Sequence, residues 1–155
     1  MDHARLIRRF YEAFAAHDAE AMAACYHPEV VFRDPAFGEL RGAEAADMWR
    51  MLIARAGGEL VVTYAAVEAD AERGRARWEA SYGFGPQRRP VHNRIAAEFA
   101  FRDGLIVHHV DRFDFHAWAR QALGLPGLLF GWTPWLRQKV RTQARQGLAR
   151  WRAGG

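Results

Sequence analysis

The sequence predicts an α+β domain in which three N-terminal helices pack on a curved antiparallel sheet, with further helices after the sheet. Two patterns predict this class. Apolar residues recur at helical spacing through residues 1–56, and four extended runs separated by loops rich in charge, glycine and proline fill residues 60–114. The chain has 155 residues, of which 50% are apolar and 26% charged, so we expect one domain and not a two-domain enzyme.

The N-terminal helices are marked by capping residues and stops. Asp2 is positioned to cap the first helix, and Asp18 to cap a short second helix that runs through Tyr26 until Pro28 prevents its continuation. Ala43–Ala56 predicts a third helix, which a pair of glycines ends.

Between the second and third helices the apolar period changes to that of a strand. Val30–Asp34 alternates like a short strand that Pro35 ends, and a loop to Gly42 follows. Four longer runs then predict an antiparallel meander: Leu60–Glu68, Arg75–Phe84, Val91–Phe101 and Leu105–Asp114.

The last hairpin of the meander constrains its own loop. Phe99 and Phe101 share a face with Leu105 and Val107 only if the loop has three residues, Arg102-Asp103-Gly104, with the glycine in a left-handed conformation. Helices that close one side of such a curved sheet predict a cone-shaped cavity.

After the sheet, Phe115–Leu123 predicts a short helix, and Thr133 is positioned to cap a helix that begins at Pro134. This last helix is amphipathic and basic. It either packs on the domain or on a dimer mate, or it contacts a membrane surface. Its apolar stripe comprises Leu136, Val140, Ala144, Leu148 and Trp151.

Charge divides the chain in the same place. Residues 1–114 hold 15 of the 22 basic side chains and all 18 acidic ones, whereas residues 115–155 hold seven basic side chains and no carboxylate. We therefore expect a domain at 1–123 and a basic helical extension at 124–155. Since 21 of the 22 basic residues are arginine, the bias is typical of GC-rich coding, and we expect no nucleic-acid partner.

No pattern marks the chain for export or for a membrane span. The single cysteine, Cys25, has no internal disulfide partner, and the first residues lack the pattern of a secretion signal. The longest uncharged run, Gln121–Leu136, is interrupted by two prolines and is shorter than the roughly 18 apolar residues of a spanning helix. We expect a cytoplasmic protein.

Asp34 is the first candidate for acid–base chemistry. Strand alternation places its carboxylate on the apolar side that carries Val30 and Phe32, where burial raises a carboxyl pKa and makes the group a competent base near neutral pH. The alternative is an aspartate that caps the turn at an Asp-Pro step.

His109 and Asp111 lie two apart on a strand and therefore share a face. A carboxylate beside a histidine fixes its tautomer and suits proton shuttling, although the pair is equally consistent with a structural contact that lines the cone. Asn93 lies on the same face of its strand as Ala97, either to bind a ligand oxygen or to tie down the hairpin. The histidines are too scattered for a metal site, and no glycine loop precedes a helix, so we expect no metal and no cofactor.

The chain resembles the nuclear transport factor 2-like superfamily, which includes ketosteroid isomerases, SnoaL-like cyclases, limonene epoxide hydrolases and binding-only proteins. The resemblance covers residues 4–123 and implies a cone-shaped fold more firmly than any single activity. It rests on Phe10-Tyr11-Glu12-Ala13-Phe14, His17-Asp18, Tyr26, Val31-Phe32-Arg33-Asp34-Pro35, Arg102-Asp103-Gly104 and Asp111-Arg112-Phe113-Asp114.

Similarity to ketosteroid isomerases implies that Asp34 corresponds to their proton-transferring aspartate, Tyr26 to a pocket tyrosine and Trp49 to a pocket aromatic. That family's oxyanion hole requires a tyrosine and a protonated aspartic acid at the positions of Phe10 and Ala97. Losing one such donor costs about 3–4 kcal/mol of transition-state stabilisation, so we do not expect steroid isomerase activity.

Similarity to limonene epoxide hydrolases implies a different set. Arg77 and Glu79 resemble the arginine and acid of that family's catalytic trio, and Asp111 corresponds to its water-activating aspartate. Phe32 and Asp34 replace the tyrosine and asparagine that position the water. Because Arg77 and Glu79 alternate with the apolar residues of their strand, they either join the site or face solvent.

These observations favour a protein that binds a small, mostly apolar molecule of polyketide, terpene or steroid type. The proton chemistry would be isomerisation, cyclisation or epoxide hydration, with Asp34 or Asp111 as the base and His109 beside it. The rival hypothesis is a non-catalytic ligand-binding or assembly module of the same fold. The residues expected to line the pocket are Phe10, Phe14, Tyr26, Phe32, Trp49, Asn93, Ala97 and Phe113.

A homodimer is expected from the outer face of the sheet. The alternation of residues 75–84 suggests an apolar patch that is too large for a monomer. The patch would comprise Trp78, Tyr82 and Phe84.

Overall fold

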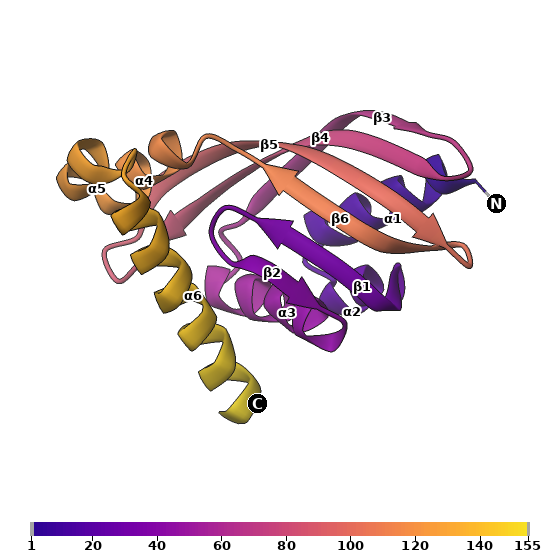
Figure 1. Cartoon of the computed structure of the whole chain (residues 1–155), viewed down its shortest axis with the longest axis horizontal. Coiled ribbons are helices and arrows are strands. Elements are labelled where there is room, and N and C mark those ends of the chain that lie inside the picture. The colour runs from indigo at the N-terminus through magenta and orange to yellow at the C-terminus, as the bar shows by residue number, and fades with distance from the viewer. Residues whose placement is uncertain (1, 155) are drawn as a thin grey trace.

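A six-stranded sheet forms the middle of the molecule in this computed structural model, which describes residues 2–154 (Figure 1). Helix α1 packs against β3 and β4, helix α3 packs against β1 and β2, and α4 and α5 gather at one end of the sheet. The elements are α1 His3–Ala15, α2 Ala19–Ala24, β1 Tyr26–Asp34, β2 Gly38–Arg41, α3 Ala43–Ala56, β3 Val61–Ala69, β4 Arg73–Phe84, β5 Arg89–Arg102, β6 Leu105–Arg112, α4 Phe115–Leu123, α5 Leu125–Phe130 and α6 Pro134–Gly154. The α+β class is confirmed.

The sheet order is β2-β1-β6-β5-β4-β3, and β3 to β6 form the predicted antiparallel meander. The sheet is mixed, however, because β1 runs parallel to β6, with Phe32 beside His109. Strand β1 begins at Tyr26 and not at Val30, so α2 is shorter than predicted. The loop predicted before Gly42 contains the short strand β2, which pairs antiparallel with β1.

The predicted three-residue loop between β5 and β6 is wrong. Arg102 pairs with Leu105, so the turn consists of Asp103 and Gly104, both in the left-handed region with φ of 54° and 74°. A β-bulge next to the turn resolves the mismatch of faces that this short loop creates. As a result Ile106, and not Val107, is fully buried.

The predicted outward patch on β4 is also wrong. Trp78 faces the interior and is 7% exposed. At the end of the same strand face, Trp118 of α4 covers Phe84 and donates its indole N–H to the Tyr82 hydroxyl at 2.8 Å. The dimer therefore stays a prediction without this support.

Helix α6 crosses from the end of the sheet to α3 (Figure 1). Leu148 is 1% exposed and joins the main core, whereas Leu136 and Val140 pack with Phe115 and Trp118 in a second cluster. This confirms that the apolar stripe of the last helix packs on the domain.

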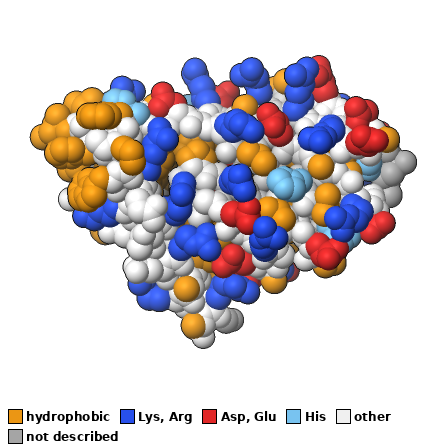
Figure 2. Space-filling view, viewed as in Figure 1, with side chains coloured by type: hydrophobic (Ala, Val, Ile, Leu, Met, Phe, Trp, Pro, Cys, Tyr) orange, Lys and Arg blue, Asp and Glu red, His pale blue; other side chains and the backbone are white. Residues whose placement is uncertain are grey.

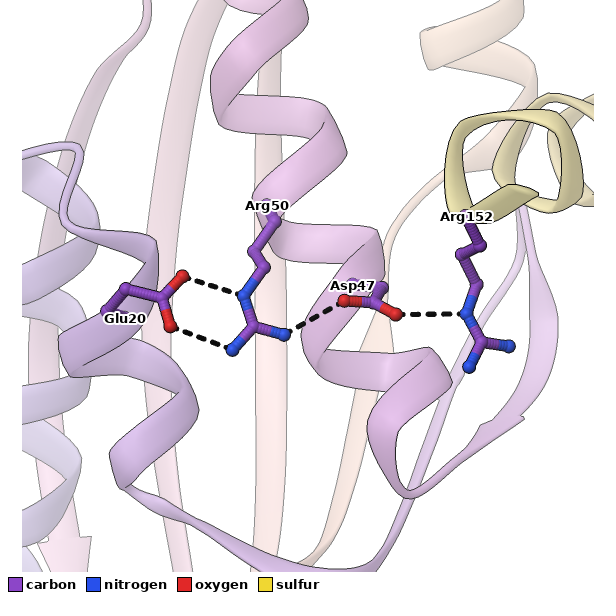
Figure 3. Close-up of polar contacts among 4 residues, drawn as sticks. All are labelled: Glu20, Asp47, Arg50 and Arg152. Carbon is purple, nitrogen blue, oxygen red and sulfur yellow. Dashed lines mark hydrogen bonds and ion pairs between the residues drawn. The ribbon is translucent and has the colours of Figure 1, made fainter. Parts of the chain in front are cut away.

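Ion pairs hold the far end of α6. Figure 3 shows Arg50 of α3 bound through two nitrogens to Glu20 of α2 and through a third to Asp47, whose other oxygen accepts from Arg152 of α6. The N–O distances lie between 2.7 and 2.9 Å. One carboxylate thus connects two arginines from different helices.

Candidate functional site

A chain of hydrogen-bonded polar side chains runs through the aromatic core. From β6, His109 Nε2 lies 2.9 Å from Asp111 Oδ1, and His109 Nδ1 lies 2.8 Å from the hydroxyl of Tyr26 on β1. Trp49 of α3 donates its indole N–H to the same hydroxyl at 2.9 Å, and Trp78 of β4 donates to Asp111 Oδ1 at 3.3 Å. Asp111 is 3% exposed and His109 is fully buried, so water does not compete for these bonds.

The hydrogen-bond partners of His109 select one tautomer of its ring. The indole of Trp49 is only a donor, so the Tyr26 oxygen accepts from it and its own proton is available for His109 Nδ1. His109 then carries its proton on Nε2 and donates it to Asp111. With this tautomer each proton of the three side chains has an acceptor.

Asp34 lies at the end of β1, next to the strand that carries Asp111. Its neighbours on the same face, Val30 and Phe32, are buried, and Asp34 itself is half-buried. Loss of hydration on burial raises its pKa to about 7, and the negative charge of Asp111 adds to the increase. The backbone N–H of Phe37 donates to Asp34 Oδ1 at 2.6 Å, and this bond lowers the pKa, although less than burial raises it. Asp34 therefore has both properties foreseen as alternatives, a raised pKa and a turn-capping bond.

Helix α6 secures the turn that Asp34 caps. Arg145 donates to the backbone carbonyls of Phe37 and Glu39 at 3.0 and 2.8 Å. The positive charge of Arg141 lowers the pKa of Asp34, although less than burial raises it. The C-terminal helix is thus the element that closes over this end of the sheet.

Tyr11 of α1 is a polar group that was not among the residues predicted for the site. Its side chain is fully buried, and its hydroxyl has no hydrogen-bond partner among residues 2–154. Burial, with the nearby charge of Asp111, raises the pKa of Tyr11 well above its ordinary value, so the group keeps its proton. A buried hydroxyl without an acceptor costs about 1–3 kcal/mol, and such a group is available to a ligand oxygen.

Aromatic rings surround His109 on several sides, with centroids 4.5–6.2 Å away, in Phe10, Tyr26, Phe32, Trp49 and Phe99. Phe14 packs on Trp49 and Trp78, Ala97 is buried opposite Asp111 in the sheet, and Phe113 is half-buried. The structure thus brings most of the expected pocket residues together.

Two hollows on the surface lie away from this cluster. The first, of about 320 Å³, is lined by Asn93 with His92, Arg94, Asp114, Ala117 and Gln121. The second, of about 380 Å³, lies between the start of α1 and the β5–β6 turn. Neither contains Asp34, His109 or Asp111, so neither is the expected cavity of the cone, and Asn93 is separate from the polar chain.

Arg77 and Glu79 do not join the site, which corrects the interpretation taken from epoxide hydrolases. Arg77 is exposed, and Glu79 forms ion pairs on the outer face of the sheet with His92 at 2.6 Å and Arg94 at 3.5 Å. The reason is strand alternation, because the inward positions of β4 belong to Trp78 and its neighbours.

Two residues of this region were not predicted for the site: Trp78, which donates to Asp111, and Tyr11, whose ring centroid lies 6.0 Å from that of Trp78. Trp78 was assigned to the wrong side of the sheet, and Tyr11 was overlooked beside Phe10. A signal for Tyr11 existed, because it belongs to the apolar stripe of the first helix and a hydroxyl on such a stripe is unusual.

Comparisons with known proteins agree with this architecture. A profile of the SnoaL-like domain matches residues 7–109. TerC, co-crystallized with polyporic acid, is 16% identical and has a TM-score of 0.66 over 77% of this chain and 96% of that chain. A candidate polyketide cyclase from Xanthomonas campestris is 20% identical, with a TM-score of 0.61 over 76% and 93% of the two chains. An LEH-like epoxide hydrolase from M. tuberculosis is 23% identical, with a TM-score of 0.61 over 81% and 92%.

At these identities the solved structures establish the fold alone, and a search of curated proteins found no significant match. The profile covers more than half of the chain and ends before α4, so it leaves the C-terminal helices outside. The chain therefore belongs to the SnoaL-like family and has its nuclear transport factor 2-like fold.

Proposed function

We propose that this protein binds a small, mostly apolar molecule beside Asp34 and transfers a proton with Asp34 as the base. The observation that carries the proposal is a carboxyl group with a pKa of about 7 beside a fully buried histidine–carboxylate pair. A base whose pKa lies near the working pH combines a large ionised fraction with a strong tendency to accept a proton.

The neighbouring groups divide the remaining work. Asp111, His109 and Tyr26 bond to one another, so their role is to hold a fixed negative charge and a fixed tautomer next to Asp34. Tyr11 is the donor without an internal partner, and its hydroxyl is suited to an oxygen on which charge develops. The surrounding aromatic rings favour an apolar ligand.

The relatives indicate the chemical range. A structural neighbour was co-crystallized with polyporic acid, and others are described as a polyketide cyclase candidate and an epoxide hydrolase. The base-catalysed forms of isomerisation, cyclisation and water addition to an epoxide each require removal of a proton, from carbon, oxygen or water. Asp34 would accept that proton and return it. Steroid isomerisation is not proposed, because Phe10 and Ala97 supply no side-chain donor.

The test uses 2-naphthol, an apolar ring system with one hydroxyl group, and follows its own fluorescence on binding. Ionised Asp34 accepts a hydrogen bond from the naphthol hydroxyl, so the affinity should rise roughly tenfold between about pH 5 and pH 8. Asp34→Asn should remove the pH dependence and keep the fold, because the amide oxygen still accepts from Phe37. Asp103→Asn, in the exposed β5–β6 turn, is the matched control and should behave like the wild type. A profile that is flat in the wild type would refute the assignment of Asp34.

A second candidate is a binding module without catalysis. It is favoured by the bond from Phe37 to Asp34 Oδ1, which already uses one carboxylate oxygen, and by the rings packed around His109. In that case naphthol binds with the same affinity across the pH range, and Asp34→Asn leaves the binding unchanged.

A further inference from the structure

The surface of the C-terminal helices carries a concentrated group of exposed apolar side chains. Among residues 2–154, six of the seven large hydrophobic side chains that are exposed fall within eleven positions of the chain, and they are 45–68% exposed. Figure 2 shows hydrophobic side chains gathered at the end of the molecule where Figure 1 places α4 and α5. We name this group the apolar knob; it comprises Leu125, Leu128, Leu129, Phe130, Trp132 and Trp135.

The large side chains are exposed because glycines occupy the side of this segment that packs closely on α4. A Cβ atom at Gly127 would lie 1.9 Å from the carbonyl oxygen of Ala119, and one at Gly131 would lie 2.9 Å from the His116 ring. Gly127 of α5 and its C-cap residue Gly131 therefore face α4, and the leucines and phenylalanine of the helix face solvent. A surface helix normally has the reverse arrangement, with its large apolar side chains in the core.

The chain segment that carries the knob has charge of one sign only. Residues 115–155 contain seven basic side chains and no acidic one. Lys139 lies 5.2 Å from the ring of Trp135, Arg137 lies 5.6 Å from the ring of Phe115, and both charged side chains are exposed. Arg120 of α4 is exposed as well. It lies beside α5, since its backbone nitrogen is 2.9 Å from where a Cβ atom of residue 127 would be.

Helix α6, in contrast, packs on the domain. The apolar stripe of α6 is buried, and Arg145 and Arg152 bond to groups of the β1–β2 turn and α3. The sequence left membrane contact through the stripe of α6 open. Because the stripe is buried, it is not available to a membrane. In residues 2–154, none of the helices combines the length and the hydropathy that a bilayer crossing requires.

We propose that the apolar knob inserts into the interfacial layer of an anionic lipid bilayer, with Arg120, Arg137 and Lys139 bound to the lipid phosphates. Tryptophan, leucine and phenylalanine next to basic residues are the combination that binds such an interface, because the rings and chains enter the acyl boundary while the cations stay at the headgroups. Trp132 suits this depth, since its indole N–H is already satisfied by the carbonyl of Leu129 at 3.0 Å. A protein partner with an acidic surface would meet the same charge, but six large apolar side chains exposed within eleven positions favour lipid.

The test is co-sedimentation of the full chain with vesicles of phosphatidylcholine, with or without phosphatidylglycerol. The wild type should bind the anionic vesicles, and the double variant Leu129→Asp/Trp132→Asp should lose roughly tenfold or more of this affinity. Val61→Asp is the matched control, because Val61 is 60% exposed on β3, outside the knob, and this variant should bind like the wild type. Lys139→Glu should weaken binding about fivefold or more on anionic vesicles alone. Circular dichroism verifies that each variant is folded.

Three results would overturn the proposal. The first is wild-type protein that stays in solution with anionic vesicles. The second is Val61→Asp losing as much binding as the double variant. The third is light scattering that reports a dimer which the double variant converts to a monomer, without wild-type binding to vesicles, because the knob would then be an interface between two copies of this chain.

Discussion

Replacing Asp34 by asparagine should stabilise the protein at neutral and alkaline pH. The ordinary pKa of an aspartate, 3.8, applies to the unfolded chain, whereas the folded chain holds Asp34 at about 7. Between these values the folded state keeps a proton that the unfolded state has released, so stability falls by about 1.4 kcal/mol for each pH unit gained. The full interval amounts to about 4 kcal/mol as an upper limit.

Because the Asp34 side chain is half-buried and keeps part of its hydration, we expect about 2 kcal/mol of this limit. Asparagine still accepts the bond from Phe37 and never ionises. The Asp34→Asn variant should therefore be more stable than the wild type above pH 7, and the difference should vanish as the pH falls toward about 4. Urea unfolding of both proteins across this pH range measures the difference directly.

Asp70→Asn is the control with the opposite sign. Backbone N–H groups of Arg73 and Glu72 lower the pKa of Asp70, so its ionised form supports the folded state at neutral pH and loses that effect on acidification. This variant should be less stable than the wild type at pH 7, with a deficit that shrinks in acid. If the stability difference between Asp34→Asn and the wild type were the same at every pH, the assigned burial of the Asp34 charge would be wrong.

Two further changes probe the polar chain and the C-terminal helix. Tyr26→Phe leaves a histidine nitrogen and an indole N–H unpaired in the core, which should cost about 2–4 kcal/mol in urea unfolding at pH 7, and a loss below about 1 kcal/mol would contradict the hydrogen-bonded chain. Asp47→Asn weakens the shared ion pair of α3 and α6, which should cost only about 0.5–1 kcal/mol because the groups are partly exposed, while hydrogen exchange accelerates in the last turns of α6. Unchanged exchange there would mean that apolar packing alone holds the helix.

The local parts of the fold were predictable because they depend on near neighbours in the chain. The caps at Asp2 and Asp18, the helix Ala43–Ala56 and the meander all follow from periods and turn residues. The parallel pairing of β1 with β6 and the bulge before His109 depend on contacts between distant segments, which leave no local signal.

In the candidate site, too, local features were predictable and contacts between distant segments were not. That His109 and Asp111 share a face was predictable, because the bulge lies before both residues and leaves their spacing intact. The bonds from Tyr26, Trp49 and Trp78 required the arrangement of four separate elements. The raised pKa of Asp34 followed from alternation, whereas the bond to Phe37 followed from the turn, and only coordinates reveal that both hold.

The parallel contact between β1 and β6 sets an order of events during folding. Tyr26 and His109 are 83 residues apart, and all of α3 and the meander must be synthesised before their strands can meet. Long-range pairings of this kind slow folding, because the entropy of closing a large loop is lost before the contact contributes any stabilisation. During synthesis β1 therefore has its neighbour β2 available long before β6, and the bond between Tyr26 and His109 can form only after β6 has been made.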